Sequence, residues 1–286
     1  MEPLSKNKRR GYLFFFSVVF VICVPVFILY AKGYRFDINK AFQISETGGL
    51  YINTDQSGIS IYVNGDVVRK TSIIQKSVFV QSLKPGTYEV SVSKDAFQTW
   101  NKTLKVFPEI VTEARSFSLK AEPTLNEIHK NLTSGDGSTT SPSRAIVKNP
   151  EYALINALFA TSTQKVIKIR NVLVKNESGL LHVSWTGEND SIPNYFCESS
   201  VCKREIIINS GADVASFDFF PGRDDLLIIR LGDGIYVSEI DDRSPQNIQN
   251  IVLGADYDFR VRNGNEIYLK KDAKIYDHTH IYIVCN

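Results

Sequence analysis

The sequence is poor in the residues from which catalytic and metal-binding sites are built. Its 286 residues include only four histidines and four cysteines, and none of them forms a ligand set with zinc-site spacing. It also has no phosphate-binding loop, no dinucleotide fingerprint and no nucleophile placed beside a base. These absences argue against an enzyme, against a bound metal and against a cofactor.

An excess of positive charge is missing from most of the chain. Lys6, Lys8, Arg9 and Arg10 stand against one acidic residue in the first eleven positions, and the remainder has a net charge of −1. Binding to nucleic acid needs a basic face, because the phosphate backbone dominates the affinity. We therefore predict no nucleic-acid partner, and we interpret residues 1–11 as a basic cytoplasmic tail.

Charged residues are entirely absent from the next segment, residues 12–31. At about 1.5 Å per residue, a helix of this length spans a hydrocarbon core of about 30 Å. Pro25 is tolerated in a membrane helix, and Tyr12 and Tyr30 lie at the ends, where aromatic rings prefer the interface. A cleaved signal peptide is the alternative, but its apolar region is shorter (about 7–15 residues), and no A-x-A-like site follows here. The segment predicts one transmembrane helix.

Basic residues flank this helix on both sides. Four precede it, while Lys32, Arg35 and Lys40 follow it. The larger number on the N-terminal side favours a cytoplasmic N-terminus, because basic residues are retained there. We expect a single-pass protein of the cytoplasmic membrane whose C-terminal body is extracytoplasmic.

The four cysteines are placed unequally. Cys23 lies in the apolar run and Cys285 lies next to the C-terminus, whereas Cys197 and Cys202 flank a short polar turn. A disulfide between Cys197 and Cys202 would staple a hairpin, which suits an oxidising compartment. Free thiols and a metal site are the alternatives, although the metal site lacks the second pair of ligands that zinc needs.

Short alternating runs separated by turn signals fill residues 46–120. Asn64-Gly65 lies between two apolar runs and is a strong hairpin signal, because both residues accept a positive φ. From Tyr88 to Val92, apolar and polar side chains alternate as on a strand with one buried face. Six or seven strands in roughly 70 residues predict a small β-sandwich. The polar residues 121–146, rich in Gly, Ser, Thr and Pro, predict a linker or long loop.

A weak internal repeat marks the C-terminal part, residues 147–286. Phe217-Asp218-Phe219 recurs as Tyr257-Asp258-Phe259, and Gly234-Ile235-Tyr236 recurs as Lys274-Ile275-Tyr276, both at an offset of 40 residues. This period predicts β-propeller-like blades, and the chain as a whole is predicted to be mainly β. Propellers close with about four or more blades. The early blades are therefore disguised, the stack is open, or another chain completes it.

The turns of the expected sandwich follow a known pattern. They include the runs Ile61–Gly65 (IYVNG), Leu83–Gly86 (LKPG) and Phe97–Trp100 (FQTW). This stretch resembles the PEGA domain family, although Gln56–Ile59 (QSGI) replaces the tetrapeptide that names the family. With its anchor and the segment Ala31–Asp37, the chain resembles membrane-anchored PEGA proteins of small-genome bacterial lineages. The resemblance implies a bacterial cell-envelope protein that works by contact and scaffolding.

Few side chains remain as candidates for chemistry. His278 and His280 could share one face of a terminal strand, but no acidic or cysteine partner accompanies them. Asp224-Asp225 and Asp241-Asp242 could act as paired carboxylates in acid–base chemistry. Both pairs lie in expected turns, where Asp is favoured for its local hydrogen bonds. We interpret them as turn residues.

These observations predict a non-enzymatic, membrane-anchored binding or scaffolding protein, with a protein or cell-wall partner. The alternative is a carbohydrate-binding module, in which Trp100 and Trp185 would offer a flat platform for sugar rings. Packing in the core competes with that role, because aromatic side chains dominate core energetics. A third hypothesis, an envelope hydrolase, would require a cleft with convergent acid, base and nucleophile.

Overall fold

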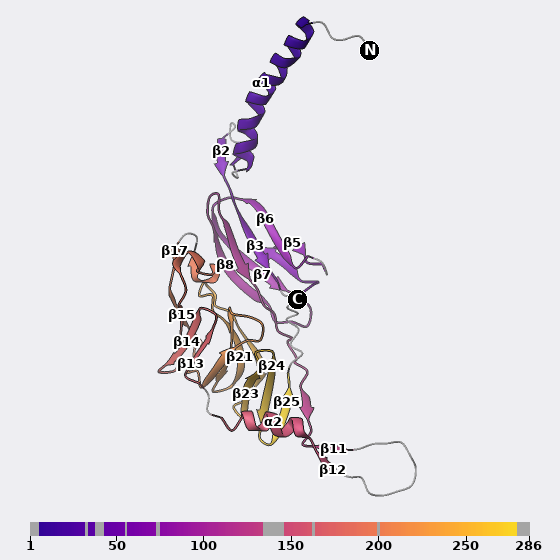
Figure 1. Ribbon diagram of the computed structural model, residues 1–286, viewed down its shortest axis with the longest axis vertical. Helices are drawn as coiled ribbons and strands as arrows, with labels where there is room; N and C mark the ends of the chain where they lie inside the picture. Colours follow the sequence, from indigo (N-terminus) through magenta and orange to yellow (C-terminus); the bar gives the residue numbers. More distant parts are fainter. Residues whose placement is uncertain are drawn as a thin grey trace, which may run out of the picture. The chain divides into compact units, whose positions relative to one another are not determined.

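The structure is a computed structural model in which residues 6–31, 34–37, 43–54, 56–72, 75–133, 146–161, 164–198 and 201–278 are described (Figure 1). The chain divides into two compact units. The first comprises residues 1–51, 79–87 and 105–112, and the second comprises residues 52–78, 88–104 and 113–286. As predicted, the secondary structure is mainly β, in several small antiparallel sheets, with one long N-terminal helix.

The N-terminal helix α1 spans Lys6–Ala31. It begins six residues before the predicted helix, because Lys and Arg are themselves good helix formers. None of its residues is buried, so its apolar side chains have no protein core to pack against. It is long and apolar enough to cross a membrane. Two short antiparallel strands, β1 (Tyr34–Asp37) and β2 (Gln43–Glu46), follow it.

Two sheets occupy the region predicted as a sandwich, and we call them the N-terminal sheets. One has the order β6-β3-β9 and the other β5-β4-β7-β8. Their strands are β3 (Gly48–Asn53), β4 (Ser60–Val63), β5 (Asp66–Lys70), β6 (Ser77–Leu83), β7 (Gly86–Ser93), β8 (Trp100–Val106) and β9 (Val111–Arg115). Asn64 and Gly65 join β4 to β5 with φ values of 53° and 86°, which confirms the predicted hairpin.

Three four-stranded antiparallel sheets follow, which we call the first, second and third sheets (Figure 1). The first contains β13 (Val166–Ile169), β14 (Val172–Glu177), β15 (Leu180–Trp185) and β18 (Glu205–Ile208). The second contains β19 (Ser216–Phe219), β20 (Leu226–Leu231), β21 (Gly234–Glu239) and β22 (Ile248–Leu253). The third contains β23 (Tyr257–Arg262), β24 (Glu266–Lys271), β25 (Lys274–Asp277) and β10 (Asn126–Ile128).

The sequence repeat corresponds to equivalent strands of the second and third sheets. Phe217-Asp218-Phe219 lies in β19 and Tyr257-Asp258-Phe259 in β23, each an edge strand of its sheet. In both copies the Asp Oδ1 accepts a hydrogen bond from the next backbone N–H, at 2.8 Å for Asp218 and 2.9 Å for Asp258. The two repeats therefore share local geometry as well as sequence.

The segment predicted as a linker contributes to the fold. Its residues Asn126–Ile128 form β10, which pairs with β25 and completes the third sheet. Next come β11 (Asn131–Thr133) and β12 (Ile146–Lys148), which pair with each other, while residues 134–145 lie outside the described residues. A backbone edge on β25 thus recruits a strand whose composition does not mark it as one.

A helix that the sequence analysis did not predict, α2 (Pro150–Leu158), precedes the first sheet. Asn149 caps it, because its side-chain oxygen accepts hydrogen bonds from the backbone N–H groups of Glu151 and Tyr152, at 3.0 and 3.4 Å. Pro150 occupies a favoured position in the first turn. Its Ile155 is fully buried against Tyr268 and Ile275 of the third sheet.

An apolar core lies between the first and the second sheet. Val174, Val183 and Ile206 come from the first sheet, and Leu227 and Ile229 come from the second. Between β15 and β18 the chain forms two 3-10 turns, η2 (Asn189–Ser191) and η3 (Asn194–Phe196), and the two-residue strands β16 (Cys197–Glu198) and β17 (Val201–Cys202).

We expect Ile155→Ala to lower the free energy of unfolding by roughly 2–4 kcal/mol, because it leaves a cavity between α2 and the third sheet. Leu154→Ala is the matched control, since the neighbouring Leu154 is 61% exposed. Its expected effect is within about 0.5 kcal/mol. Urea unfolding of the full chain in detergent measures both, and equal effects of the two changes would show that α2 is not packed as described.

Candidate functional site

A fully buried lysine lies where strand β8 meets the second sheet. The Lys102 ammonium donates to the Glu239 carboxylate, to the backbone oxygen of Asp241 at 3.2 Å and to that of Arg243 at 2.7 Å. It also lies 5.9 Å from the centre of the Trp100 ring. A lysine has three donors, and all three have acceptors here. The charge is therefore buried without an unmet hydrogen bond.

Glu239, the last residue of β21, collects donors from several directions. Its carboxylate accepts from Trp100 Nε1 at 3.0 Å, from the Asn247 backbone N–H at 2.6 Å and from Asn247 Nδ2 at 2.8 Å, in addition to Lys102. Burial raises the pKa of Glu239, and the positive charge of Lys102 opposes that rise. We call Trp100, Lys102, Glu239 and Asn247 the Lys102 cluster.

Backbone hydrogen bonds extend the same contact along the edge of β8. The Asn101 N–H donates to Asn247 Oδ1 at 3.0 Å, and Asn247 Nδ2 donates to the Asn101 carbonyl at 2.7 Å. The Thr103 N–H donates to the Ser244 carbonyl at 2.7 Å. The edge strand β8 is thus covered by the loop that follows β21, which removes an open edge from the surface.

The carboxylates that the sequence marked as acid–base candidates are held in ion pairs. The pairs are Arg223–Asp225 at 2.5 Å, Arg243–Asp241 at 2.5 Å, Arg170–Asp224 at 3.2 Å and Lys203–Asp242 at 2.6 Å. Asp225 and Arg223 are both buried. Each candidate carboxylate therefore faces a cation rather than a second carboxylate, and the geometry is that of structural turns.

The hydrogen bonds that join the Lys102 cluster and its neighbours to the second sheet come from one segment of the chain, from Gln98 to Leu119. Residues 47–120 match the family model of the PEGA domain. Among solved structures, the chain is similar to Hsv2 of Kluyveromyces lactis, with 11% identity over 79% of this chain and 72% of that chain. The TM-score is 0.26, which is too low to support a shared fold. A search of curated proteins found no match.

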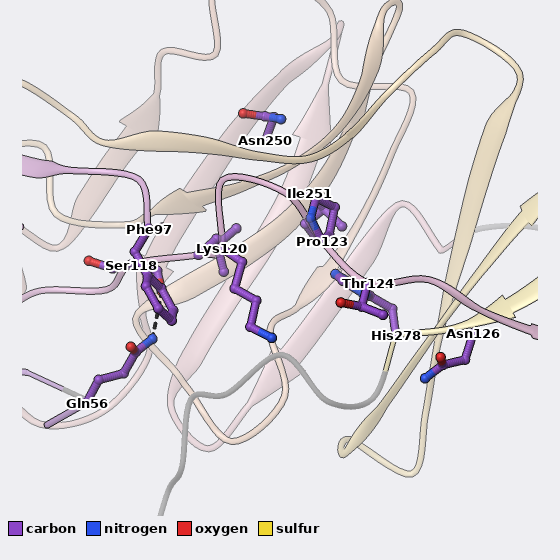
Figure 2. Close-up of a pocket in the computed structure, with 11 residues that line it drawn as sticks. Gln56, Phe97, Ser118, Lys120, Pro123, Thr124, Asn126, Asn250, Ile251 and His278 are labelled. Carbon is purple, nitrogen blue, oxygen red and sulfur yellow. Dashed lines mark hydrogen bonds between the residues drawn. The ribbon is translucent and has the colours of Figure 1, made fainter. Parts of the chain in front are cut away.

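A cavity of about 210 Å³ lies between the PEGA domain and the sheets, in the second unit (Figure 2). Phe97 and Lys120 of the PEGA domain line it, together with Asn250 of the second sheet and His278, which follows β25. Figure 2 shows the hydrogen bond by which a Gln56 amide donates to the Ser118 carbonyl at its rim, at 2.9 Å. The volume is below the roughly 300–1,000 Å³ of typical ligand pockets.

The two tryptophans do not form the platform for sugar rings that the sequence allowed. Trp100 is fully buried and its indole N–H is used by Glu239. Trp185 is 9% exposed, lies 6.4 Å from the Phe196 ring and donates its N–H to the Glu188 carbonyl at 2.9 Å. Both rings pack inside the protein, so neither presents a flat face to solvent.

The two central cysteines are brought together. Cys197 and Cys202 are directly paired across the short strands β16 and β17, and their Sγ atoms form a disulfide. His278 is buried at the end of the third sheet, while His280 and Cys285 lie outside the described residues. Within the described part of the chain, no group of three His, Cys, Asp or Glu side chains converges as a metal site would require.

Lys102 and Glu239 were not predicted as site residues, although the sequence of β8 carries part of the signal for them. Along β8, Trp100, Lys102, Leu104 and Val106 alternate with exposed or half-buried residues and are themselves buried. A lysine on the inward face of a strand needs an acidic partner, because burying an unpaired charge is costly. The partner itself, 137 residues away, has no local signal.

We expect Lys102→Met to destabilise the chain by roughly 3–5 kcal/mol, because it leaves Glu239 buried without its cation. The double variant Lys102→Met, Glu239→Gln removes both charges and should recover much of that loss. Lys105→Met, on the exposed side of β8, is the control and should change stability by less than about 0.5 kcal/mol. Denaturant unfolding measures all three, and a double variant no better than the single one would contradict the pairing.

His278 gives the stability a dependence on pH. Burial lowers its pKa to about 4, against an ordinary value near 6.5, with Lys120 and Asp277 as the neighbouring charges. The folded state therefore prefers neutral His278, and its contribution is fully present above about pH 6.5 and lost as pH falls towards 4. At pH 5 the loss should be about 2 kcal/mol relative to pH 7.

The comparison that isolates this effect is the same pH series on His278→Asn. The variant should lose about 2 kcal/mol less between pH 7 and pH 5 than the unmodified chain, whatever its absolute stability. Other acidic groups, such as Glu239, titrate equally in both chains and cancel. Identical pH slopes for the two chains would show that His278 is not buried in its neutral form.

Proposed function

We propose that this chain is a non-enzymatic, membrane-anchored scaffold whose PEGA domain and β-sheets are held outside the cytoplasm for binding a protein or cell-wall partner. The observation that carries the proposal is the Lys102 cluster. Its charged groups are buried and paired with each other, so they hold the PEGA domain against the second sheet rather than facing a substrate. A fixed contact of this kind is what a scaffolding protein needs, because it holds the binding surfaces of the two parts in one arrangement.

The anchor supports the membrane part of the proposal. The apolar side chains of α1 remain exposed along its length, and water is a poor solvent for such a surface. A bilayer removes this surface from water and satisfies the helix backbone internally. The four basic residues before the apolar run favour the cytoplasmic side for the N-terminus.

The cysteine pair supports the extracytoplasmic placement of the body. Disulfides persist in oxidising compartments and are rare in the cytosol. Cys197 and Cys202 face each other across a hairpin that leaves Val201 71% exposed, so the pair lies on a surface segment. Carbohydrate binding has lost its main support, since Trp100 and Trp185 are buried.

Thiol labelling in intact cells tests the topology and redox state together. The chain carries Cys23→Ser and Cys285→Ser, leaving Cys197 and Cys202 as its thiols. With a membrane-impermeant reagent, we expect labelling of these two only after reduction, because oxidised sulfur does not react with it. Labelling after lysis without a reductant would place the body in the cytoplasm and overturn the proposal.

Two single-cysteine reporters without Cys197 and Cys202 provide the control for sidedness. Lys8→Cys lies in the N-terminal turn of α1, and Leu253→Cys replaces a side chain that is 61% exposed at the end of β22. We expect Leu253→Cys to be labelled in intact cells and Lys8→Cys only after lysis. The reverse pattern would invert the orientation whatever the redox state.

A further inference from the structure

The three four-stranded sheets form a stack with two ends. The first sheet packs on the second through the core that contains Val183 and Leu227. The second sheet lies against the third, with β19 and β21 beside β23, and Arg230 forms an ion pair with Asp258 at 3.6 Å. In such a stack the middle sheet is covered on both faces, and each end sheet needs its outward face covered by something else.

The helix α2 covers the face of the third sheet that carries Tyr268 and Ile275. Ile155 packs against Tyr268 and Ile275, which lie on the opposite face of the sheet from buried Phe259 and Leu269. Arg260 and Lys270 of the same face bind the helix, donating to the Leu158 carbonyl at 3.1 Å and to the Asn156 side chain at 3.0 Å. This end of the stack is therefore closed by the chain itself.

None of the described residues covers the other face of the first sheet in this way, and several of its apolar side chains are exposed. Val166 is 47%, Leu180 45% and Ile207 51% exposed, and half-buried Leu173 lies among them. The inward residues of the same strands, such as Val174 and Val183, are fully buried against the second sheet. We call the outward side the outer face of the first sheet.

The strand register arranges this face in two straight rows across β13, β14, β15 and β18. One row is Val166, Lys175, His182 and Ile207, and the other is Lys168, Leu173, Ser184 and Glu205. The first row ends in an apolar side chain on each edge strand, Val166 on β13 and Ile207 on β18. The second row begins with a cation on β13 and ends with an anion on β18.

We propose that the outer face of the first sheet packs on the same face of a second copy of this chain, about a two-fold axis that runs parallel to the strands between β14 and β15. Such an axis reverses the strand order, so β13 of one copy lies over β18 of the other. Lys168 then meets Glu205 of the second copy, and Val166 meets Ile207 of the second copy, twice each. The face is complementary to itself in charge and in apolar surface.

The closed end of the stack favours this two-fold arrangement over a head-to-tail one. If the first sheet packed on the third sheet of the next copy, α2 would stand in the way, because Ile155 occupies that face. A two-fold contact closes after two copies and leaves α2 at both ends. The assembly is then a finite stack rather than a fibre.

The size of the face determines where the contact should be looked for. Four strands about 4.8 Å apart and roughly 15–20 Å long give about 300 Å² of sheet per copy. That is below the roughly 800 Å² per partner of a standard stable interface. Two copies anchored in one membrane have a high effective concentration, which compensates for a weak contact. The inference therefore concerns the full chain in its membrane, and it holds for either orientation of the body.

Cross-linking in membranes tests the arrangement. Two differently tagged chains, one with Val166→Cys and the other with Ile207→Cys, are co-expressed with all four native cysteines replaced by serine and are treated with a short bifunctional thiol reagent. We expect covalent dimers that carry both tags, at least fivefold above a Leu253→Cys pair. Within one chain the two positions are about 14 Å apart, three strand spacings, and single-cysteine chains exclude that link altogether.

Charge reversal supplies the matched variants. Lys168→Glu places two carboxylates opposite each other and should lower the yield of mixed dimers at least fivefold, while Lys168→Glu with Glu205→Lys should restore at least half of it. Lys70→Glu, on exposed β5, is the control and should change nothing. Mixed dimers no more frequent than the Leu253→Cys background, or unaffected by Lys168→Glu, would overturn the proposal. Cross-links to another protein without mixed dimers would also overturn it.

Discussion

One buried ammonium group, that of Lys102, determines how the PEGA domain meets the second sheet. Removing a charged amine from water costs several kcal/mol, and this cost is offset only where acceptors surround the group. Glu239 and the carbonyls of Asp241 and Arg243 provide them. A small slip of β8 along its neighbour would leave the ammonium without acceptors. We infer that the cluster selects one docking geometry, whereas an apolar contact alone would tolerate several.

The parts of the fold that depend on local chemistry were predictable from the sequence. Asn64-Gly65 makes a hairpin because its two residues accept positive φ, whatever surrounds them. The uncharged run of α1 is long enough for a bilayer without reference to any other segment. The 40-residue repeat marked equivalent strands, because Asp218 and Asp258 make the same bond to the next backbone N–H.

What could not be predicted depends on pairing between distant segments. The strand β10 exists because β25 offers an open edge, and nothing in Asn126–Ile128 alone marks a strand. Core packing of Trp100 was one of the two sequence expectations, but its partner Glu239, which accepts the indole N–H, lies 139 residues away and has no local signal. The helix α2 could have been predicted, because Asn149-Pro150 is a recognised start signal for a helix. It was not predicted, because the surrounding segments have β patterns.

The hydrophobic pattern of each strand indicates whether its sheet is covered on one face or on both. Strand β20 of the second sheet contains Leu226-Leu227-Ile228-Ile229, a continuous run in which all four side chains are buried, as expected for a strand covered on both faces. Strand β13 of the first sheet alternates exposed and buried residues, as expected for a strand covered on one face. The outer face of the first sheet is not a typical solvent-exposed surface, because the apolar residues Val166 and Ile207 occupy exposed positions that polar residues could fill. Among the described residues, apolar side chains are exposed on the first sheet, whereas α2 packs on the third. This difference is the observation on which the proposed contact between two copies depends.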